Sequence, residues 1–467
     1  MKNIDAFFQK NFLWGASTSA FQVEGAAYSH GKGVSVADIR TKKKNDVQMD
    51  TTVSVDHYNH LEEDVQLMVD LGLKAYRFSI NWTRVLPNGD LSKINDEGVQ
   101  FYHRLLDLLI KNNIEPIVTM FHFDFPYALV EKYDGWVSKN AIEDFYAYAS
   151  FLIKEFGGKV RYWLTINEQN VMVGQPEILG IEDENKTELY RKSQIANINM
   201  CVAQAKVFKL VREKYPDLKI GPAVSYITAL PENGESQNVL LAKTVEDMFS
   251  FSLMDISLRG NLPKSLMNVL EEAGIENYIS DEEKSILKEG TANYLAVNWY
   301  CTTTFKLKGS FDPKTPQLEN LEIVKNPNLD YTKWNWSFDP IGLRYAMQQL
   351  NDRYPNVEII ITECGWSEEE TLEDGQVHDS KRVSYLKEHI KQLGLSIYDG
   401  VNIIGFCPWS FIDLLSVNDG MEKRYGLVYV DRDNFNKKTL NRYRKDSFYY
   451  YKEVIKSNGK MILSKDD

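Results

Sequence analysis

Eight short runs rich in β-branched and aromatic residues recur along this chain, separated by longer stretches with helical spacing of their apolar residues. The runs are Asn11–Ser17, Ala75–Ile80, Ile114–Phe123, Tyr162–Glu168, Ile220–Tyr226, Tyr294–Tyr300, Val357–Glu363 and Val401–Ser410. Nearly continuous apolar runs are typical of parallel strands that are covered on both faces. The pattern therefore predicts eight parallel strands joined by crossover helices.

The intervening stretches are predicted to be amphipathic helices. In Leu61–Leu71 the apolar residues share one face, and Gly72 supplies a C-terminal stop. Similar stretches are Gly98–Asn112, Ala141–Phe156, Ile195–Tyr215, Pro340–Leu350 and Asp379–Leu393. Eight strands in one chain favour closure into a (β/α)8 barrel, with a doubly wound open sheet as the alternative.

No linker, tandem repeat or low-complexity block divides the chain, so residues 1–467 are predicted to form a single barrel domain. Three connections are longer than a barrel needs, namely Glu24–Tyr58, Ile227–Asp247 and Cys301–Asp339. We expect them to be loops on the rim that shape a pocket.

Charge and cysteine usage restrict the class of protein. The net charge of −12 argues against binding to nucleic acid or to an anionic membrane. The cysteines are Cys201, Cys301, Cys364 and Cys407, and none forms a CxxC pair. The sequence has no run of 18 apolar residues and no signal-peptide pattern, so we expect a cytoplasmic protein.

Two glutamates stand at the ends of predicted strands, where the chemistry of a (β/α) barrel takes place. Glu168 ends the fourth run and Glu363 ends the seventh. A retaining glycosidase needs two carboxyl groups roughly 5–5.5 Å apart, one ionised and one protonated. Arg77, near the tip of the second run, is a candidate cation to keep one of them ionised. The alternative is that each glutamate is a buried partner in a structural salt bridge.

Motifs at successive strand ends carry a resemblance to a known family. They are WGASTSAFQVEGA, RFSINWTR, HFDFP, TINEQN, NWY, ITECGW, PWSFID and KRYGLVYVD, and they span nearly the whole chain. Together they resemble family 1 of the glycoside hydrolases, the β-glucosidase family. The resemblance implies that Glu168 is the acid/base and Glu363 the nucleophile, with Arg77 and Tyr300 hydrogen-bonded around the nucleophile. It implies no cofactor and no metal.

The same resemblance implies a set of substrate-binding residues, which are Gln22, His122, Asn167, Asn298, Tyr300, Trp336 and Trp409. Gln22 and His122 match the ligands of the equatorial sugar hydroxyls, and Asn167 matches the donor to the 2-hydroxyl. Trp409 matches the platform beneath the glycone, the sugar whose bond is cleaved. Trp336 matches the aromatic wall of the aglycone site.

Three positions depart from the family pattern. Cys364 follows the nucleophile where the family usually has asparagine, Gln169 follows the acid/base in place of proline, and Phe123 replaces a common tryptophan. None of them removes a reacting group. Cys364 replaces a hydrogen-bonding amide by a weak donor, which affects how the nucleophile is positioned.

The last rim loop predicts a phosphorylated substrate. Ser416-Val417 stands where β-glucosidases acting on plain sugars have Glu-Trp, and a serine can donate to a phosphate that a glutamate would repel. With Lys423 and Tyr425, this set resembles the phosphate clamp of the 6-phospho-β-glucosidase and 6-phospho-β-galactosidase branch. The segment Met421–Lys445, with eight Lys/Arg against three acids, agrees with this interpretation.

The small Val417 favours glucosides, whereas the Ser416-to-Lys423 spacing and the HFDFP motif match galactoside-type enzymes. We therefore expect a 6-phospho-β-glucosidase, with a 6-phospho-β-galactosidase as the alternative. An unphosphorylated β-glucosidase and a non-catalytic sugar-phosphate-binding barrel are weaker alternatives. A metal-dependent hydrolase is weaker still, because the histidines form no HxH or HExxH motif. The expected partner is a small phosphorylated glycoside, and the sequence predicts no oligomeric state.

Overall fold

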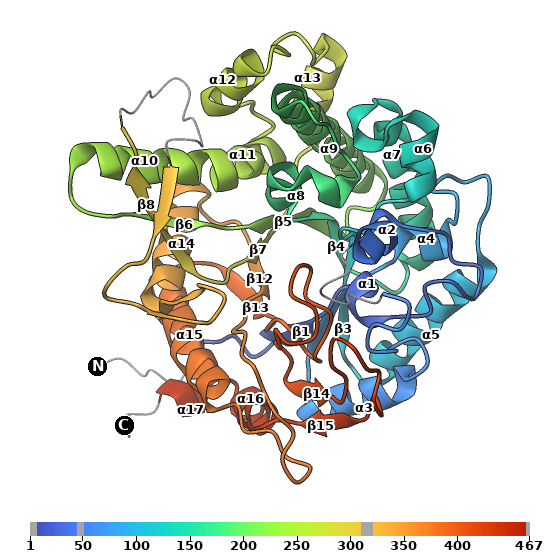
Figure 1. The fold of residues 1–467 in the computed structure, drawn as a ribbon, viewed down its shortest axis with the longest axis vertical. Coiled ribbons are helices and arrows are strands. Elements are labelled where there is room, and N and C mark those ends of the chain that lie inside the picture. The colour runs from blue at the N-terminus through green and yellow to red at the C-terminus, as the bar shows by residue number, and fades with distance from the viewer. Residues whose placement is uncertain (1–6, 44–50, 310–320, 464–467) are drawn as a thin grey trace.

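The computed structural model describes residues 7–43, 51–309 and 321–463, and its centre is a closed barrel of eight parallel strands (Figure 1). The barrel strands are β1 (Leu13–Ser17), β2 (Ala75–Ser79), β3 (Glu115–Phe121), β4 (Tyr162–Asn167), β5 (Lys219–Ser225), β7 (Leu295–Asn298), β12 (Ile359–Glu363) and β13 (Ile403–Phe406). The first strand pairs with both β2 and β13, which closes the sheet. Closure excludes the doubly wound alternative and confirms the predicted barrel.

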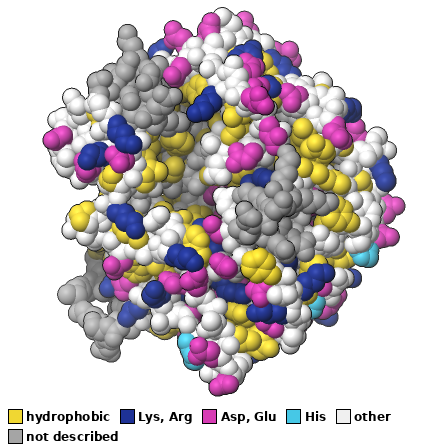
Figure 2. Space-filling view, viewed as in Figure 1, with side chains coloured by type: hydrophobic (Ala, Val, Ile, Leu, Met, Phe, Trp, Pro, Cys, Tyr) yellow, Lys and Arg dark blue, Asp and Glu magenta, His cyan; other side chains and the backbone are white. Residues whose placement is uncertain are grey.

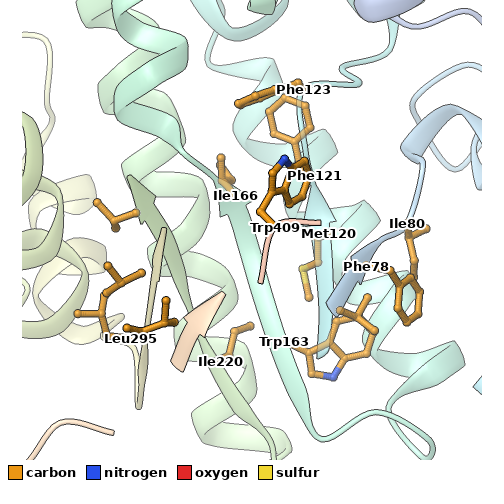
Figure 3. Packing of buried hydrophobic residues seen from close by; sticks show 14 of the residues in the cluster. Phe78, Ile80, Met120, Phe121, Phe123, Trp163, Ile166, Ile220, Leu295 and Trp409 are labelled. Atoms are coloured by element: carbon orange, nitrogen blue, oxygen red, sulfur yellow. The ribbon is translucent and has the colours of Figure 1, made fainter. Parts of the chain in front are cut away.

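Alternating side chains fill the inside of the barrel and cover its outside. On β2, Ala75 belongs to the inner cluster of buried residues while its neighbour Tyr76 packs outward in the larger core. Ile117 and Leu164 contribute to the same inner cluster from β3 and β4. Figure 3 shows part of the larger core, where aromatic and aliphatic side chains of neighbouring strands and strand ends gather. The barrel is therefore a packed core that holds its strand ends rigidly.

The outer layer consists of helices that surround the barrel (Figure 1). The main ones are α3 (Leu61–Leu71), α5 (Asp96–Lys111), α7 (Asn140–Phe156), α9 (Lys186–Lys214), α11 (Ser252–Arg259), α14 (Pro340–Arg353), α15 (Ser380–Tyr398) and α16 (Asp446–Lys456). Each predicted helix overlaps one of these, although Asn112, Tyr215 and Asp379 lie one residue outside the observed bounds. Gly72 ends α3 in the left-handed region at φ +84°.

Further helices lie in the connections between these elements. They are α1 (Ala20–Val23), α2 (Val36–Lys43), α4 (Trp82–Val85), α6 (Tyr127–Tyr133), α8 (Gln169–Gly174), α10 (Ser236–Glu246), α12 (Lys264–Glu272), α13 (Asp281–Glu289) and α17 (Lys460–Leu463). Two 3₁₀ turns, η2 (Gly135–Val137) and η3 (Pro176–Leu179), and one π-helical turn, η4 (Asp247–Phe251), complete the set.

Two of the predicted rim loops contain a small sheet that the sequence did not reveal. Strand β6 (Thr228–Pro231) pairs with β8 (Thr302–Leu307), which pairs with β9 (Leu321–Val324). Two further hairpin-like pairs join β10 (Asp330–Tyr331) to β11 (Ser337–Phe338) and β14 (Val428–Val430) to β15 (Arg442–Arg444). Residues 44–50 and 310–320 of the predicted loops lie outside the described residues.

Surface properties add two observations. On the face shown in Figure 2, acidic and basic side chains are interspersed. Among the described residues, no helix is long and apolar enough to span a bilayer, and no cluster of three or more His, Cys, Asp or Glu side chains could hold a metal ion.

Candidate active site

Glu363, the last residue of β12, lies buried among hydrogen-bond donors. Arg77 pairs through Nη1 with its Oε1, and the hydroxyl of Tyr300 donates to its Oε2. Arg77 is itself held, because Nη2 donates to Asn167 Oδ1 at 2.6 Å and Nε donates to Thr119 Oγ1 at 2.9 Å. The structure therefore brings Arg77 and Tyr300 to the carboxylate where the sequence predicted them.

Glu168 directly follows β4 and is 8% exposed. Its backbone is in the left-handed region at φ +44°, a conformation that a non-glycine residue adopts only when its surroundings enforce it. Its N–H donates to Ala223 O at 2.8 Å, and Asn298 Nδ2 donates to its Oε1 at 3.0 Å. The strand end thus fixes the direction of this carboxyl group.

The two carboxyl groups sit in different electrostatic surroundings. Burial, and then the nearby charge of Glu363, raises the pKa of Glu168 to about 8. Burial also raises the pKa of Glu363, but the Arg77 cation and the hydrogen bond from Tyr300 oppose that rise. At neutral pH a proton is therefore held more readily by Glu168 than by Glu363.

An amide network connects the carboxyl groups to His122. Asn298 accepts from Thr362 Oγ1 at 2.7 Å and donates to Asn167 Oδ1 at 3.1 Å, and Asn167 Nδ2 donates to His122 Nε2 at 3.1 Å. Burial, and then the charge of Arg77, lowers the pKa of His122 well below its usual range, so the ring is neutral. Because Nε2 accepts, the proton is on Nδ1, which is buried and has no hydrogen-bond partner within residues 7–43, 51–309 and 321–463.

Trp409, in the loop after β13, is 5% exposed and lies over the His122 ring with 5.9 Å between centroids and 21° between planes. Gln22, on α1, accepts from Ser19 Oγ at 2.6 Å and donates to Leu415 O at 2.5 Å. Gln22 therefore connects α1 to the loop after β13 through hydrogen bonds.

Trp336 lies between Tyr300 on one side and Tyr425 and Lys423 on the other. Its ring centroid lies 4.8 Å from that of Tyr300 and 5.8 Å from that of Tyr425. The Lys423 ammonium lies 4.2 Å from the same ring centroid. The predicted aromatic wall thus contacts both the surroundings of Glu363 and the residues predicted to bind phosphate.

A polar cluster, formed by Ser416, Asp419, Lys423 and Tyr425, occupies this side of the pocket. Ser416 Oγ lies 3.2 Å from Tyr425 Oη, and Lys423 Nζ lies 3.2 Å from Asp419 Oδ2. Burial lowers the pKa of Lys423, and Asp419 opposes that effect. Trp336 lies against both Tyr425 and Tyr300, and Tyr300 donates to Glu363, so the cluster adjoins the surroundings of Glu363. The structure thus brings the three predicted residues together and adds Asp419.

Asp419 was not predicted from the sequence, although an acid four residues before Lys423 was a signal for an ion pair within a tight turn. Thr119 was also not predicted, although it lies two residues beyond the inward-facing Ile117 and therefore points into the barrel with it. Tyr385, on α15, had no local signal.

The basic segment Met421–Lys445 does not form a positive field around the cluster, and our use of it as support was wrong. Most of its cations pair with carboxylates outside the cluster: Arg424 and Lys445 with Asp413, Arg442 with Asp64, Arg444 with Asp70, and Lys438 with Asp431 and Asp433. Lys423 is the cation of this segment that the structure places in the cluster.

Cys364, which directly follows Glu363, is fully buried. Its Sγ lies 3.3 Å from the hydroxyl of Tyr385, which donates to Tyr300 O at 3.1 Å. The sulfur thus contacts the side chain that holds the backbone of Tyr300. Gln169, the departure that follows Glu168, donates to Asn197 O at 2.9 Å and accepts from Gln204 Nε2 at 2.6 Å.

The sequence profile of "Glycosyl hydrolase family 1" matches residues 4–460. The chain belongs to glycosyl hydrolase family 1. This confirms the resemblance drawn from the motifs, and the closed barrel is the architecture found in solved members of family 1. A family 1 β-glucosidase from Thermotoga maritima superposes with a TM-score of 0.87 at 30% identity, covering 97% of this chain and 99% of that chain.

Curated relatives within family 1 are similar over almost their full length. The aryl-phospho-β-D-glucosidase BglC of Bacillus subtilis is 39% identical, covering 97% of this chain and 98% of the relative. A 6-phospho-β-glucosidase of Dickeya chrysanthemi is 34% identical, covering 97% and 99%. A 1,4-β-D-glucan glucohydrolase of Thermotoga neapolitana is 32% identical, covering 97% and 99%.

Proposed function

We propose that this protein hydrolyses β-glucosides that carry a 6-phosphate, with retention of configuration. The observation that carries the proposal is the position of Ser416, Lys423 and Tyr425 beside the carboxyl pair. The names of the relatives from Bacillus subtilis and Dickeya chrysanthemi support the same substrate class.

In this reaction Glu168 supplies the proton that the leaving-group oxygen takes up, because its raised pKa keeps it protonated at neutral pH. Glu363 attacks the anomeric carbon and forms a covalent glycosyl-enzyme, while Arg77 and Tyr300 hold it in place. Glu168, now ionised, then removes a proton from the water that attacks the same carbon. Two inversions give net retention.

The sugar ring lies on Trp409, whose indole provides an apolar platform for the C–H face. Nδ1 of His122 donates to an equatorial hydroxyl, since it has no partner within the described part of the chain. Asn167 contacts the 2-hydroxyl, and Gln22 contacts a hydroxyl on the far side of the ring. Asn298 donates to both Glu168 and Asn167 and so fixes their side chains relative to each other.

The phosphate binds at the polar cluster, where Ser416 and Tyr425 donate hydrogen bonds and Lys423 supplies the positive charge. Trp336 covers the boundary between phosphate and aglycone. Val417 packs against the core beside Ser416, which leaves the volume near the 4-hydroxyl unfilled by a large ring and favours glucosides.

A kinetic comparison of four chromogenic substrates tests this proposal: the aryl β-glucoside and β-galactoside, each with and without the 6-phosphate. We expect kcat/KM to be highest for the glucoside 6-phosphate. A higher kcat/KM for the galactoside 6-phosphate would favour the alternative, a 6-phospho-β-galactosidase. Equal kcat/KM values with and without the 6-phosphate would reject the proposed phosphate site. Binding without any turnover would favour a non-catalytic barrel.

The wider setting follows from the same chemistry. A sugar phosphate is charged and is retained inside cells, so we place the enzyme in the cytoplasm as a single-domain barrel. Carboxyl groups perform the acid, base and nucleophile steps, so the reaction as proposed uses no cofactor. The net negative charge argues against a nucleic-acid partner.

A further inference from the structure

Asp419 places a carboxylate inside the polar cluster. Its Oδ2 lies 3.2 Å from Lys423 Nζ and 3.4 Å from Ser416 Oγ, so one carboxylate oxygen contacts two of the three groups that would bind a phosphate. A phosphate oxygen held by the same two groups would lie in nearly the same place. Two anions cannot share that place at neutral pH without strong repulsion.

We propose that Asp419 is an internal counter-anion, which pairs with Lys423 when the pocket has no substrate and is displaced by the 6-phosphate. This inference rests on the proposed function, because it assumes that the phosphate binds at the cluster. It makes Asp419 a specificity-determining residue that competes with the substrate.

The surroundings of Lys423 explain why it carries a counter-anion. Its side chain is only 8% exposed and lies among the rings of Trp334, Trp336 and Tyr425. An ammonium group that is largely removed from water needs a negative partner. Asp419 supplies it in the free protein.

The Asp419 side chain can also move away from Ser416 and Lys423. It stands in the turn where Ser416 N donates to Gly420 O at 3.0 Å, so the backbone of the turn is held independently of this side chain. The Asp419 side chain is 34% exposed, which gives it a route to water on the outer side of the turn. Rotation about its χ1 angle would then free Ser416 and Lys423 together without moving the turn.

An opposite role is conceivable for the same contacts. If Asp419 remained in place and oriented Lys423 toward the phosphate, removing its charge would weaken substrate binding. The two roles therefore predict changes of opposite sign in the affinity for a phosphorylated ligand, which makes them separable by one substitution.

The test is Asp419→Asn, which keeps the shape of the side chain and removes its charge. The matched control is Glu422→Gln, which removes one negative charge from the exposed side of the same loop, beside Lys423 in sequence. Each protein is measured with an aryl β-glucoside 6-phosphate, with the unphosphorylated aryl β-glucoside, and by calorimetric titration with glucose 6-phosphate.

We expect Asp419→Asn to lower KM for the phosphorylated substrate and Kd for glucose 6-phosphate by on the order of tenfold, because a like charge is removed at close range. Its kcat should change by much less than its KM. Glu422→Gln should shift both constants less than about twofold, as expected for an exposed charge.

Unchanged or weaker binding of both phosphorylated ligands by Asp419→Asn would overturn the inference while leaving the proposed function intact, provided that the parent prefers the phosphorylated substrate. A parent without that preference would overturn both. A gain of equal size with the unphosphorylated glucoside would also overturn the inference, because competition with phosphate would then not be its cause.

Discussion

The carboxyl pair and the polar cluster are connected through Trp336 but are built differently. Glu168 and Glu363 stand at the ends of strands β4 and β12, inside a closed barrel whose backbone is hydrogen-bonded on both sides. Ser416, Lys423 and Tyr425 stand on an irregular loop after β13 that is held by side-chain ion pairs. In the proposed reaction, bond cleavage would thus take place at the strand ends of the barrel, and a loop would select the substrate.

This difference has a physical reason. A nucleophile and an acid must be positioned to within a fraction of an ångström, which strand ends provide. A phosphate is a large anion that accepts many hydrogen bonds, so a loop with a serine, a phenol and an ammonium group can bind it without the same precision. The following predictions separate the two regions by the kinetic constant that each controls.

The largest effect is expected for Glu363→Gly. We expect kcat to fall by at least roughly 10⁴-fold because the covalent intermediate cannot form. Added azide should restore turnover of an activated aryl glucoside 6-phosphate and give the α-glucosyl azide that still carries its 6-phosphate, as shown by NMR of the product. For comparison, Glu168→Gly with azide should give the β-glucosyl azide, and the same anomer from both variants would contradict the assigned roles.

Lys423→Met should act on selection alone. The apolar stem is kept beside Trp336 while the charge is lost, so we expect KM for the 6-phosphate substrate to rise roughly 10²-fold. Steady-state kinetics with and without the phosphate measure this change. Lys437→Met is the control, because Lys437 is exposed on the same basic segment. An equal change in KM for both variants would mean that the total charge of the segment, and not the position of Lys423, determines substrate binding.

The pH profile reports on Glu168. Its pKa of about 8 means that the acid loses its proton as the pH rises through that value, so kcat/KM for a poor leaving group should fall about tenfold per pH unit above it. A dinitrophenyl leaving group requires no protonation and should show a much flatter basic limb. A steep limb with both leaving groups would assign that titration to another group.

The smallest effect is expected for Tyr385→Phe. Loss of the hydroxyl that donates to Tyr300 O and contacts Cys364 should reduce kcat several-fold and lower stability by about 1 kcal/mol. Thermal melts and kcat measure the two effects. Tyr449→Phe, on the exposed face of α16, is the control, and equal changes in kcat would exclude a positioning role for Tyr385.

The barrel was predictable because each of its strands is buried on both faces and appears as a continuous apolar run. The three-stranded sheet of β6, β8 and β9 was not, because it pairs segments that lie far apart in sequence. Their residues alternate in burial only partly, as in Leu321–Val324, where no residue is fully buried. Such strands depend on their partners more than on a local pattern.

Family motifs were sufficient to select Glu168, Glu363 and Ser416 as candidate site residues. Contacts that cross the fold had no local signal: Asn298 reaching Glu168, or Tyr385 reaching Cys364. The basic segment misled us for a related reason, because a count of charges cannot reveal that Arg442 pairs with Asp64, 378 residues away.

Neighbouring residues of the loop after β13 point in different directions. Lys423 and Tyr425 face the cluster, while Arg424 between them points to Asp413 in the interior. Mutations at the pocket-facing positions would therefore leave the anchor of the loop untouched. During evolution, such enzymes could change the sugar that they accept by single substitutions without losing the folded loop. The same positions could be substituted one at a time in protein design.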